Sequence, residues 1–369
     1  MESERNSEGG VRLLIAGGGT GGHLFPAVAI AEEFLRRDSS NSVLFIGTER
    51  GLENRVLGAY GYPLRTMQVE GIRGRGAVKS LMSLSRIPRG MMQARSIIRD
   101  FAPHVVLGVG GYASGPAVMT ACLMGIPTAI AEQNALPGCT NRILGRFVQS
   151  IFLAFPDGEG VFPARKVVVT GNPVRREIWE DSETTGEDRE MLRLLIFGGS
   201  QGASTINRVV TESLPHLEDL KEGLMFLHQT GEGEYAGVSK AYLDRGLDAA
   251  VTPFISDMAS AYRWADLVIC RAGATSIAEI TAAGKASILI PFPFAVGNHQ
   301  VLNARVLHDA GAATMILEDD LSGHGLAGLL RSFHGDRKMI RKMARQSKKL
   351  GRKKAAADIV DRCLALQRV

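Results

Sequence analysis

The sequence predicts an α/β protein made of two Rossmann-like domains that face one another across a cleft. Apolar runs of strand length alternate with stretches of helical periodicity along the chain, a pattern typical of parallel sheets with helices on both faces. The segment LLIAGGGTGGH, beginning at Leu13, is echoed by LLIFGGSQGAS, which begins at Leu194. A length of 369 residues is enough for two such domains, each with a core of its own.

The first of these segments indicates a strand, a glycine-rich turn and a helix. Val11–Ala16 is an apolar run of strand length, and apolar residues recur at helical spacing from Leu24 to Arg37. Glycine permits positive φ angles and the close approach of a ligand, and the N-terminus of the following helix favours an anion. The turn is therefore predicted to hold phosphate groups, with a tight turn that binds nothing as the alternative.

The same glycines permit a second interpretation. Gly17, Gly19 and Gly22 fit the G-x-G-x-x-G pattern of dinucleotide-binding proteins, and Glu49 is a candidate to hold the ribose. This hypothesis predicts an NAD-dependent enzyme. A single glycine pattern is weak evidence, and the hypothesis leaves the second segment unexplained because GGSQGAS does not repeat the pattern.

Between Asp100 and Glu132 the chain carries no charge unless His104 is protonated, so a membrane span has to be considered. Glycines and prolines interrupt this stretch too often for the roughly 20 apolar residues that a span requires. We expect instead a strand at Val105–Val109, a buried helix and a strand at Thr128–Ala131.

Polar side chains follow the strands of the first half. Tyr112, Glu132 and Asn134 each come after one of the two strands just described. They are expected to lie near His23, since ligands bind beyond the carboxyl ends of parallel strands. His23 stands at the N-terminus of a helix, which favours the neutral imidazole that a general base requires. A purely structural histidine is the alternative.

The second half begins after a polar, acidic segment, Asp181–Glu190, which is the predicted linker. Leu267–Cys270 is a predicted strand, followed by a turn and a helix whose first amides, with Thr275 and Ser276, are suited to a phosphate. Glu279 is suited to ribose hydroxyls; alternatively, Ser276 and Glu279 form a capping box that only completes the helix end.

A further strand is expected at Ser287–Ile290. The residues after it form either an amide-rich cluster suited to sugar hydroxyls or an ordinary loop and helix start: Asn298, His299, Gln300 and Asn303.

The net charge of +5 is unevenly distributed. Residues 337–354 hold ten Lys and Arg and no acid, and without them the net charge would be −5; such a run favours a solvated helix. Residues 71–99 hold seven basic residues and no acid, interleaved with apolar ones, which suits either an anionic membrane surface or a solvated helix with a buried face. Neither segment has an aromatic residue to stack on a base, so nucleic acid is not an expected partner.

The composition, 45% hydrophobic and 22% charged, is that of a globular protein. Four cysteines lie far apart without the spacing of a metal site and are expected to be reduced, mostly buried thiols of a cytosolic protein: Cys122, Cys139, Cys270 and Cys363. The polar start MESERNSEGG lacks the apolar region of a signal peptide.

Seven motifs, taken in order, resemble those of glycosyltransferase family 28, and in particular of its bacterial N-acetylglucosaminyltransferases: GGTGGH, EQN, GNPVR, GGSQGA, FISDM, RAGATSIAE and NHQ followed by NA. The resemblance extends from residue 11 to residue 365. It implies the GT-B fold, inversion at the anomeric centre, and neither a metal nor another cofactor. The implied hexosyl transfer moves N-acetylglucosamine from UDP-N-acetylglucosamine to the C4 hydroxyl of the muramyl sugar of undecaprenyl-linked lipid I, giving lipid II.

The resemblance also implies donor contacts. Ile255 would offer backbone groups to uracil, and Glu279 would hold the ribose. Ser200 and the turn at Ala274 would take the diphosphate, and Gln300 would take sugar hydroxyls. The full set implied for UDP-N-acetylglucosamine is Thr20, Gly21, Gly22, Asn134, Arg175, Ser200, Ile255, Ala274, Thr275, Ser276, Ile277, Ala278, Glu279 and Gln300.

On the acceptor side, the resemblance implies that His23 is the general base, with Glu132 as its rival and Tyr112 as a further catalytic candidate. Asn134 would reach the donor sugar from the same loop. Many relatives carry a histidine directly before the EQN motif, where this chain has Ala131. A mechanism that depends on that histidine is therefore not carried over.

The expected segments are a disordered tail at 1–10, an N-terminal acceptor and membrane-associating domain at 11–173, a C-terminal donor domain at 174–345, and a basic helix at 346–369 that packs back on the N-terminal domain. Expected partners are the two substrates and an anionic membrane surface, with cell-wall or division-complex proteins as further candidates. The expected location is the cytoplasmic face of the bacterial inner membrane, as a peripheral protein. Alternatives are another GT-B sugar-nucleotide enzyme, such as a glycolipid synthase or an epimerase, and a non-catalytic UDP-sugar-binding membrane subunit.

Overall fold

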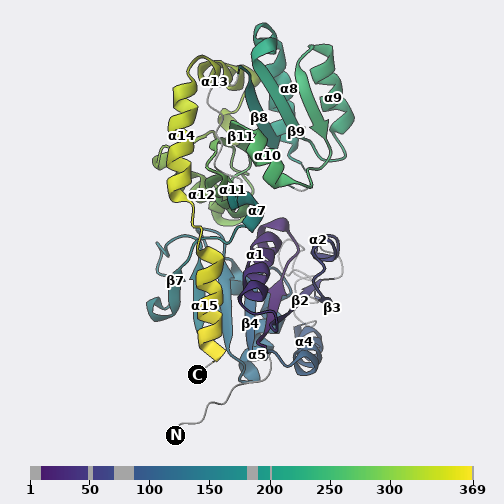
Figure 1. The fold of residues 1–369 in the computed structure, drawn as a ribbon, viewed down its shortest axis with the longest axis vertical. Coiled ribbons are helices and arrows are strands. Elements are labelled where there is room, and N and C mark those ends of the chain that lie inside the picture. The colour runs from purple at the N-terminus through teal and green to yellow at the C-terminus, as the bar shows by residue number, and fades with distance from the viewer. Residues whose placement is uncertain (1–9, 49–52, 70–86, 181–189, 200–201, 368–369) are drawn as a thin grey trace. The chain divides into compact units, whose positions relative to one another are not determined.

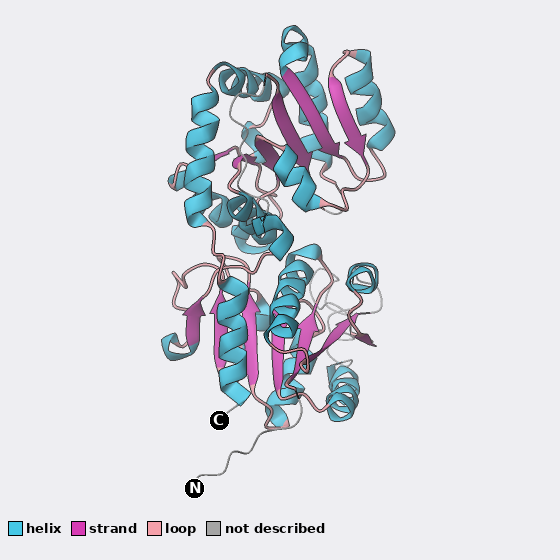
Figure 2. Ribbon diagram, viewed as in Figure 1, coloured by secondary structure: helices cyan, strands magenta, loops and turns pink. Residues whose placement is uncertain are grey.

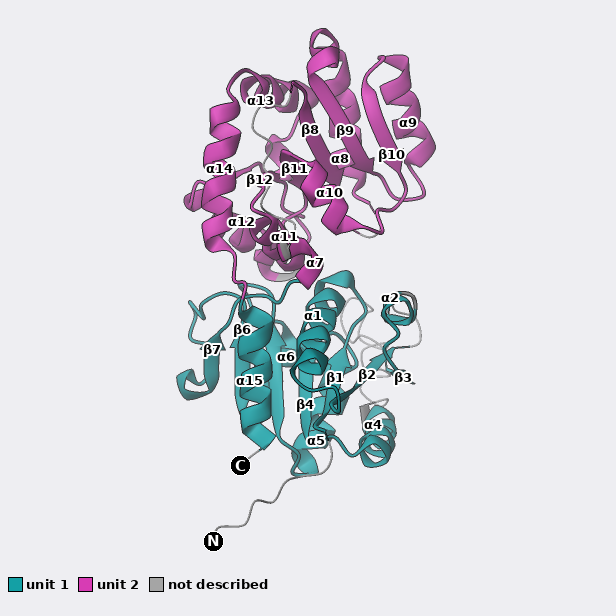
Figure 3. Ribbon diagram, in the orientation of Figure 1, with its two compact units in different colours: residues 1–175, 354–369 teal, residues 176–353 magenta. Residues whose placement is uncertain are grey.

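The computed structural model describes residues 10–48, 53–69, 87–180, 190–199 and 202–367. The chain divides into two units, shown in teal and magenta in Figure 3. Unit 1 comprises residues 1–175 and 354–369, and unit 2 comprises residues 176–353. The division falls before the acidic segment 181–190, of which only Glu190 lies among the described residues.

Unit 1 is a parallel sheet with helices on both faces (Figures 1 and 2). Its described part has seven strands in the order β3-β2-β1-β4-β5-β6-β7. Leu13 of β1 lies opposite Val43 of β2 on one side and Val105 of β4 on the other. The strands are β1 (Arg12–Gly17), β2 (Ser42–Thr48), β3 (Leu64–Met67), β4 (Val105–Gly110), β5 (Thr128–Glu132), β6 (Ser150–Leu153) and β7 (Val167–Val169).

Two hydrophobic cores cover the two faces of this sheet, because successive side chains of a strand point to opposite faces. Leu13 and Ile15 of β1 join a core with α1 and α15, whereas Leu14 and Ala16 join a core with α4 and α5. The helices are α1 (Gly21–Arg37), α2 (Glu53–Tyr60), α4 (Ile87–Phe101), α5 (Ser114–Leu123), α6 (Cys139–Leu144), the short 3-10 helix η1 (Ala164–Lys166) and α15 (Ala355–Gln367).

Unit 2 repeats this architecture with six parallel strands in its described part, in the order β10-β9-β8-β11-β12-β13. The strands are β8 (Leu192–Phe197), β9 (Leu224–Gln229), β10 (Asp248–Thr252), β11 (Leu267–Cys270), β12 (Ala286–Leu289) and β13 (Ala313–Met315). The α-helices are α7 (Arg176–Glu180), α8 (Ser204–Ser213), α9 (Tyr235–Asp244), α10 (Met258–Trp264), α11 (Ala274–Ala283), α12 (His299–Asp309), α13 (Gly323–Gly335) and α14 (Arg337–Leu350). The 3-10 helices are η2 (Leu214–His216), η3 (Glu218–Gly223), η4 (Val296–Asn298) and η5 (Glu318–Asp320).

The predicted fold class, two Rossmann-like α/β units, is confirmed. In each sheet the strand order reverses beside the unit's first strand, between β1 and β4 and between β8 and β11. Ligands of such sheets bind at this reversal, beyond the carboxyl ends of the strands. Both glycine-rich segments leave their strands there, so the topology places each of them where a ligand is expected.

The uncharged stretch after Asp100 forms a strand, a helix and a strand, as predicted, namely β4, α5 and β5. Over the described ranges, the chain has no helix with the length and apolar character needed to span a bilayer.

The C-terminal region consists of two helices where the sequence suggested one basic helix at 346–369. The boundary expected at residue 345 falls inside α14, which belongs to unit 2 and ends where Gly351 turns to an extended conformation. The basic residues belong to α14 and the turn after it; α14 buries Ile340, Ala344 and Ser347 and exposes most of its charges. Helix α15 contains two aspartates and one arginine, so it is not basic.

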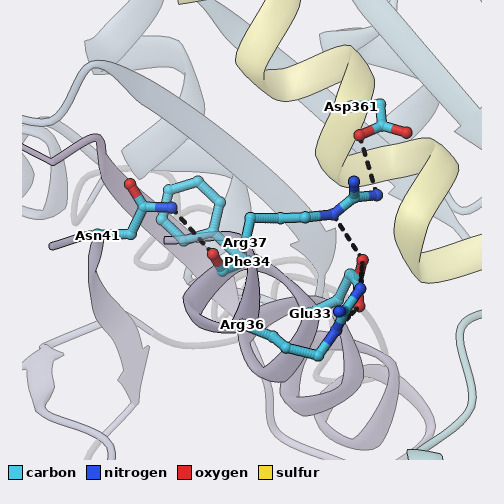
Figure 4. Close-up of polar contacts among 6 residues, drawn as sticks. All are labelled: Glu33, Phe34, Arg36, Arg37, Asn41 and Asp361. Carbon is cyan, nitrogen blue, oxygen red and sulfur yellow. Dashed lines mark hydrogen bonds and ion pairs between the residues drawn. The ribbon is translucent and has the colours of Figure 1, made fainter. Parts of the chain in front are cut away.

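Helix α15 packs on unit 1, where Ile359, Val360 and Cys363 join the core beneath α1. Figure 4 shows the polar edge of this contact, in which the Arg37 guanidinium of α1 lies between two carboxylates. Nε of Arg37 lies 2.7 Å from Oε1 of Glu33, and Nη2 of Arg37 lies 3.0 Å from Oδ1 of Asp361 in α15. All four cysteines are free thiols: Cys270 and Cys363 are buried, Cys122 is partly buried and Cys139 is exposed.

A buried polar network lies beneath the second glycine-rich segment. The side-chain nitrogen of Asn207, Nδ2, donates to the carbonyl of Thr230 at 2.9 Å. The side-chain oxygen of Asn207, Oδ1, therefore faces His228 and accepts from its Nε2 atom at 3.1 Å. Nδ1 of His228 then accepts from the hydroxyl of Tyr242 at 3.2 Å. The imidazole is completely buried, and this burial lowers the pKa of His228 to about 3.

This histidine is expected to make the protein less stable in mild acid. Below pH 6.5 the unfolded chain binds a proton on His228 that the native state does not accept, so stability falls as the pH drops toward 3. Between pH 8 and pH 5 the free energy of unfolding should fall by about 2 kcal/mol through this residue. Denaturant titrations at the two pH values measure the difference. The variant His228→Gln should lose most of this dependence, whereas the exposed control His216→Gln should keep it; equal pH dependence in both variants would exclude His228 as its source.

Candidate active site

The first glycine turn joins β1 to α1, and its backbone is determined by neighbouring strands. Gly17, Gly18 and Gly19 have φ angles of 153°, 136° and 87°. A Cβ atom on Gly17 would lie 2.4 Å from the carbonyl oxygen of Gly110, at the end of β4. Only glycine therefore fits here, because β1 and β4 approach one another at backbone distance.

The side chain of Glu53, in α2, accepts a hydrogen bond from this turn and thereby fixes its conformation. Its side chain is 0% exposed, and its Oε1 atom accepts hydrogen bonds from the amide of Gly19 at 2.8 Å and from the amide of Thr48 at 3.3 Å. The amide of Gly18 donates to the carbonyl of Gly110 at 3.3 Å. Two amides of the turn are thus used within the fold, which counts against the dinucleotide hypothesis. Glu49, the proposed ribose ligand of that hypothesis, lies outside the described residues.

His23 lies in the first turn of α1 and is partly exposed. Its Nδ1 atom lies 3.0 Å from Oε1 of Gln133, a side chain that is 2% exposed. A Cβ atom on Gly110 would lie 2.7 Å from Cε1 of His23, so the ring occupies the space that this glycine leaves. The structure therefore brings the start of α1, the end of β4 and Gln133, directly after β5, together around one imidazole.

Glu132, the rival base, is buried, and both of its carboxylate oxygens accept hydrogen bonds from residues that follow it in sequence. Oε1 accepts from the amide of Asn134 at 3.0 Å and from its side-chain nitrogen at 3.3 Å. Oε2 accepts from the amide of Gly138 at 2.9 Å and from Nδ2 of Asn141 at 2.9 Å. Four donors thus surround a carboxylate that is 3% exposed. Tyr112, the remaining acceptor-side candidate, is 57% exposed just after β4.

The other donor-site candidates of unit 1 lie near the same strand ends. Thr20, Gly21 and Gly22 form the start of α1, where the carbonyl of Thr20 accepts from the amide of His23 at 3.2 Å. Arg175 is buried, with its guanidinium 4.5 Å from the centre of the Phe25 ring and 3.2 Å from the hydroxyl of Tyr60.

The second glycine turn, between β8 and α8, is held by Gln229. Its Nε2 atom donates to the carbonyl of Gly199 at 2.6 Å, and its Oε1 atom accepts from the amide of Ile255 at 3.3 Å. A Cβ atom on Gly202 would lie 2.1 Å from the carbonyl oxygen of Thr230. The predicted uracil contact, Ile255, is therefore linked to the glycine turn; Ser200, the predicted phosphate contact, lies outside the described residues.

Helix α11 begins at Ala274, after the N-cap Gly273. The capping-box alternative for Ser276 and Glu279 is wrong, because the N-cap is Gly273 and Ser276 lies inside the helix. Glu279 is instead buried in the second turn, where its Oε2 atom accepts from the hydroxyl of Tyr262 at 3.2 Å. The first five residues of the helix, Ala274–Ala278, which are predicted to bind the phosphate, are thus followed directly by the buried carboxylate of Glu279.

The amide-rich cluster after β12 divides into structural and surface positions. Asn303 is completely buried and donates to the carbonyl of Ala272 at 3.3 Å, in the turn before α11. Oε1 of Gln300 accepts from the amide of Phe292 at 2.9 Å. Asn298 is exposed and has a φ angle of 55°, and His299 is partly exposed.

Sequence reasoning missed several residues whose partners are distant along the chain. Besides Glu53, Gln133 and Gln229, it gave no role to Arg271, which pairs with Glu318 at 2.5 Å. Glu318 in turn accepts from the hydroxyl of Thr205 in α8 at 2.9 Å. The described residues contain no group of three or more His, Cys, Asp or Glu side chains arranged to hold a metal ion.

Comparison with known proteins gives matches over both units. The sequence model of the glycosyltransferase family 28 N-terminal domain matches residues 13–153, and that of the family's C-terminal domain matches residues 193–362. Similar curated proteins bear the name UDP-N-acetylglucosamine--N-acetylmuramyl-(pentapeptide) pyrophosphoryl-undecaprenol N-acetylglucosamine transferase. The one from Syntrophus aciditrophicus is 55% identical, covering 97% of this chain and 99% of the relative. The one from Myxococcus xanthus is 49% identical, covering 96% and 93%.

Solved structures agree with this result. The structure of Acinetobacter baumannii MurG is 33% identical and superimposes with a TM-score of 0.76, covering 96% of this chain and 99% of that one. The UDP-GlcNAc 2-epimerase of Neisseria meningitidis superimposes with a TM-score of 0.68 at 14% identity, covering 96% and 100%. At that identity the second likeness concerns the fold alone.

Proposed function

Because this chain belongs to glycosyltransferase family 28, we propose that it transfers N-acetylglucosamine from UDP-N-acetylglucosamine to the C4 hydroxyl of the muramyl sugar of undecaprenyl-linked lipid I, with inversion at the anomeric carbon. The observation that carries this proposal is the 55% identity, over 97% of the chain, to a relative named for that transfer. An NAD-dependent enzyme and a non-catalytic subunit are not proposed, since the matches cover both units and are named as transferases.

The donor is proposed to bind unit 2 at the carboxyl ends of its strands. The amides at the start of α11 favour the charge of a diphosphate, and Glu279 offers carboxylate oxygens to the ribose hydroxyls. The amide of Ile255 donates to Gln229 at 3.3 Å, a long bond for an amide donor, so a uracil oxygen can replace it. Gln300, in the first turn of α12, is proposed for the sugar hydroxyls.

The acceptor is proposed to meet His23 in unit 1. The C4 hydroxyl must lose its proton as it attacks the anomeric carbon, and the imidazole accepts it. The leaving UDP gains negative charge in the transition state, and helix N-termini and Arg175 stabilise that charge without a metal. Asn134 is proposed to contact the donor sugar from the loop that Glu132 holds.

Transfer of labelled N-acetylglucosamine from UDP-N-acetylglucosamine to a soluble lipid I analogue tests the proposed function. The reaction should proceed in the presence of EDTA, and the product should carry a β-linkage. A chain that binds UDP-N-acetylglucosamine but transfers no label would be a binding subunit. Dependence of the rate on an added divalent cation would overturn the metal-free mechanism.

Replacing Glu279 with glutamine is expected to raise the donor KM by roughly 5- to 150-fold, the equivalent of about 1–3 kcal/mol for a hydrogen bond to a charged group. The kcat at saturating donor should change far less, because the ribose is remote from the reacting carbon. Steady-state kinetics with varied UDP-N-acetylglucosamine measure both constants. Tyr262→Phe, which removes one hydrogen-bond donor to Glu279 but keeps the carboxylate, is the matched control and should leave the KM nearly unchanged. A lower melting temperature with a parental KM in Glu279→Gln would assign the carboxylate a structural role only.

Unit 1 is also proposed to dock on an anionic membrane surface through α4, placing the enzyme peripherally on the cytoplasmic face of the bacterial inner membrane. Helix α4 buries Ala94 and Ile98 and turns Arg89, Met92 and Arg95 outward. Met92 is 68% exposed between the two arginines, a mixture suited to lipid headgroups. The basic residues Arg73, Arg75, Lys79 and Arg86 lie outside the described residues. Proteins of cell-wall synthesis or division are further candidate partners.

The double variant Arg89→Glu, Arg95→Glu should bind vesicles that contain phosphatidylglycerol at least about tenfold more weakly, since each basic residue near such a surface contributes about 1 kcal/mol. Co-sedimentation at low and high salt measures the binding. Arg341→Glu, Arg345→Glu on α14 is the control with the same change in net charge, and it should bind like the parent. Equal weakening in both double variants would show a nonspecific charge effect instead of a docking face. Both should transfer sugar to a soluble acceptor at the parental rate.

A further inference from the structure

The side chain of Gln133 lies beside the imidazole of His23, and the orientation of its amide can be determined from its contacts. The side-chain amide of Gln133 lies between two groups, with Oε1 at 3.0 Å from Nδ1 of His23 and Nε2 at 3.3 Å from the carbonyl oxygen of Ala131. A carbonyl oxygen can only accept hydrogen bonds, so the NH2 group of the amide must face Ala131. The amide oxygen therefore faces the imidazole.

An oxygen opposite Nδ1 requires that Nδ1 carry the proton. In a neutral imidazole one nitrogen donates and the other accepts, and the partner of one nitrogen selects the tautomer. With Nδ1 donating to Gln133, the lone pair lies on Nε2. We propose that Gln133 is a positioning residue that holds His23 in the Nδ1–H tautomer and thereby makes Nε2 the atom that accepts the proton of the acceptor hydroxyl. This inference rests on the proposed transferase function.

The packing around the ring supports a single orientation. Gln133 is 2% exposed, so its amide is shielded from competing water. A Cβ atom on Gly110 would lie 2.7 Å from Cε1 and 2.8 Å from Nδ1 of the ring, so the backbone of β4 covers the Nδ1 side. The imidazole itself is partly exposed, and with its Nδ1 side covered, Nε2 is the nitrogen left to meet a substrate.

The carbonyl that orients Gln133 is itself held in place. The oxygen of Ala131 also accepts from Nδ2 of Asn141 at 3.2 Å, and the same Asn141 nitrogen lies 2.9 Å from Oε2 of Glu132. The orientation of the imidazole is thus connected through Gln133 and the end of β5 to the buried carboxylate of Glu132. The contact depends on the backbone oxygen of residue 131, so an alanine side chain at that position is compatible with it.

The tautomer can be measured without any substrate. Long-range proton–nitrogen NMR correlations of the folded protein distinguish Nδ1–H from Nε2–H imidazoles, and the variant His23→Asn identifies the His23 signals among the eight histidines. The neutral His23 should show the Nδ1–H pattern. An Nε2–H pattern would overturn the proposal even if transfer proceeds normally, whereas an Nδ1–H pattern in a protein that transfers no sugar would refute only the function.

Kinetics of Gln133→Met supply the second measurement. Methionine matches glutamine in length but offers Nδ1 no comparable acceptor, so kcat should fall roughly 10- to 100-fold at an unchanged donor KM. Gln133→Glu keeps an oxygen opposite Nδ1 and should restore the Nδ1–H pattern. Its carboxylate stabilises the imidazolium, so the acidic limb of its kcat–pH profile should move to higher pH.

The matched control is Gln149→Met, which removes the hydrogen bonds of another glutamine to Thr128 at the opposite end of β5. It should retain the parental kcat and pH profile. A parental kcat and pH profile in Gln133→Met would overturn the positioning role. If Gln133→Met fails to fold, the tautomer of the parent protein and the shifted limb of Gln133→Glu decide the question alone.

Discussion

Replacing His23 with alanine is expected to lower kcat by about 10²–10⁴, the usual contribution of a general base. The imidazole stands at the start of α1, its Nδ1 side is held by Gln133, and its ring is partly exposed. The donor KM should change little, because the proposed uracil and ribose contacts, Ile255 and Glu279, belong to unit 2. The acidic limb of the kcat–pH profile should disappear, since no imidazole is left to be protonated. Initial rates with a soluble lipid I analogue from pH 5 to pH 9 test both expectations.

The control for this experiment is His216→Gln, at an exposed histidine of unit 2, which should retain both kcat and the acidic limb. If His23→Ala keeps a near-parental kcat, or keeps the acidic limb while only a KM rises, the imidazole is not the base. Glu132 would then be the remaining candidate.

Replacing Glu132 with glutamine is expected to act mainly on stability, lowering the free energy of unfolding by about 3 kcal/mol. The carboxylate accepts four hydrogen bonds from Asn134, Gly138 and Asn141, two on each oxygen. Glutamine can present its carbonyl to only one pair of donors, so its NH2 group must face the other pair in a buried site. Urea denaturation of both proteins measures the difference.

Glu159→Gln, at an exposed glutamate of the same unit, should leave stability unchanged. At temperatures where Glu132→Gln remains folded, its kcat–pH profile should retain the acidic limb that His23→Ala loses. A variant of parental stability that loses this limb would make Glu132 the base and leave His23 the role of positioning a substrate.

Much of the fold follows from local patterns. The strand Leu267–Cys270 was predicted with the bounds it has, and the strand expected at Val105–Val109 extends by one residue to Gly110. Continuous apolar runs between glycines are typical of strands buried on both faces. The C-terminal region was less predictable, because charge does not reveal where a helix ends; the break at Gly351 depends on the extended conformation of that glycine.

Some residues of the candidate site could likewise be predicted from local sequence patterns, and others could not. His23, Glu132 and Glu279 were identifiable because each follows a strand or a glycine turn. Glu53 gave no such signal, because its role depends on a partner 34 residues away in sequence. Gln133 follows a strand as well, but its partner His23 lies 110 residues away in sequence, so no local pattern assigns it that role. The capping box of Ser276 and Glu279 illustrates the opposite error: a local pattern fits, but the helix starts at Ala274 and the carboxylate meets Tyr262 instead.

Helix α15 has a consequence for how the protein is made. A ribosome synthesises residues 1–175 first, yet the core beneath α1 also contains Ile359, Val360 and Cys363. Domains generally fold as units during synthesis, starting from the N-terminus, but here unit 2 is complete in the growing chain before unit 1 has received its last helix. The apolar residues that α15 covers on α1 and β4 stay uncovered while residues 176–353 are translated, so the nascent chain exposes an apolar surface until α15 has been synthesised. Helix α15 therefore completes unit 1, whose synthesis begins before that of unit 2.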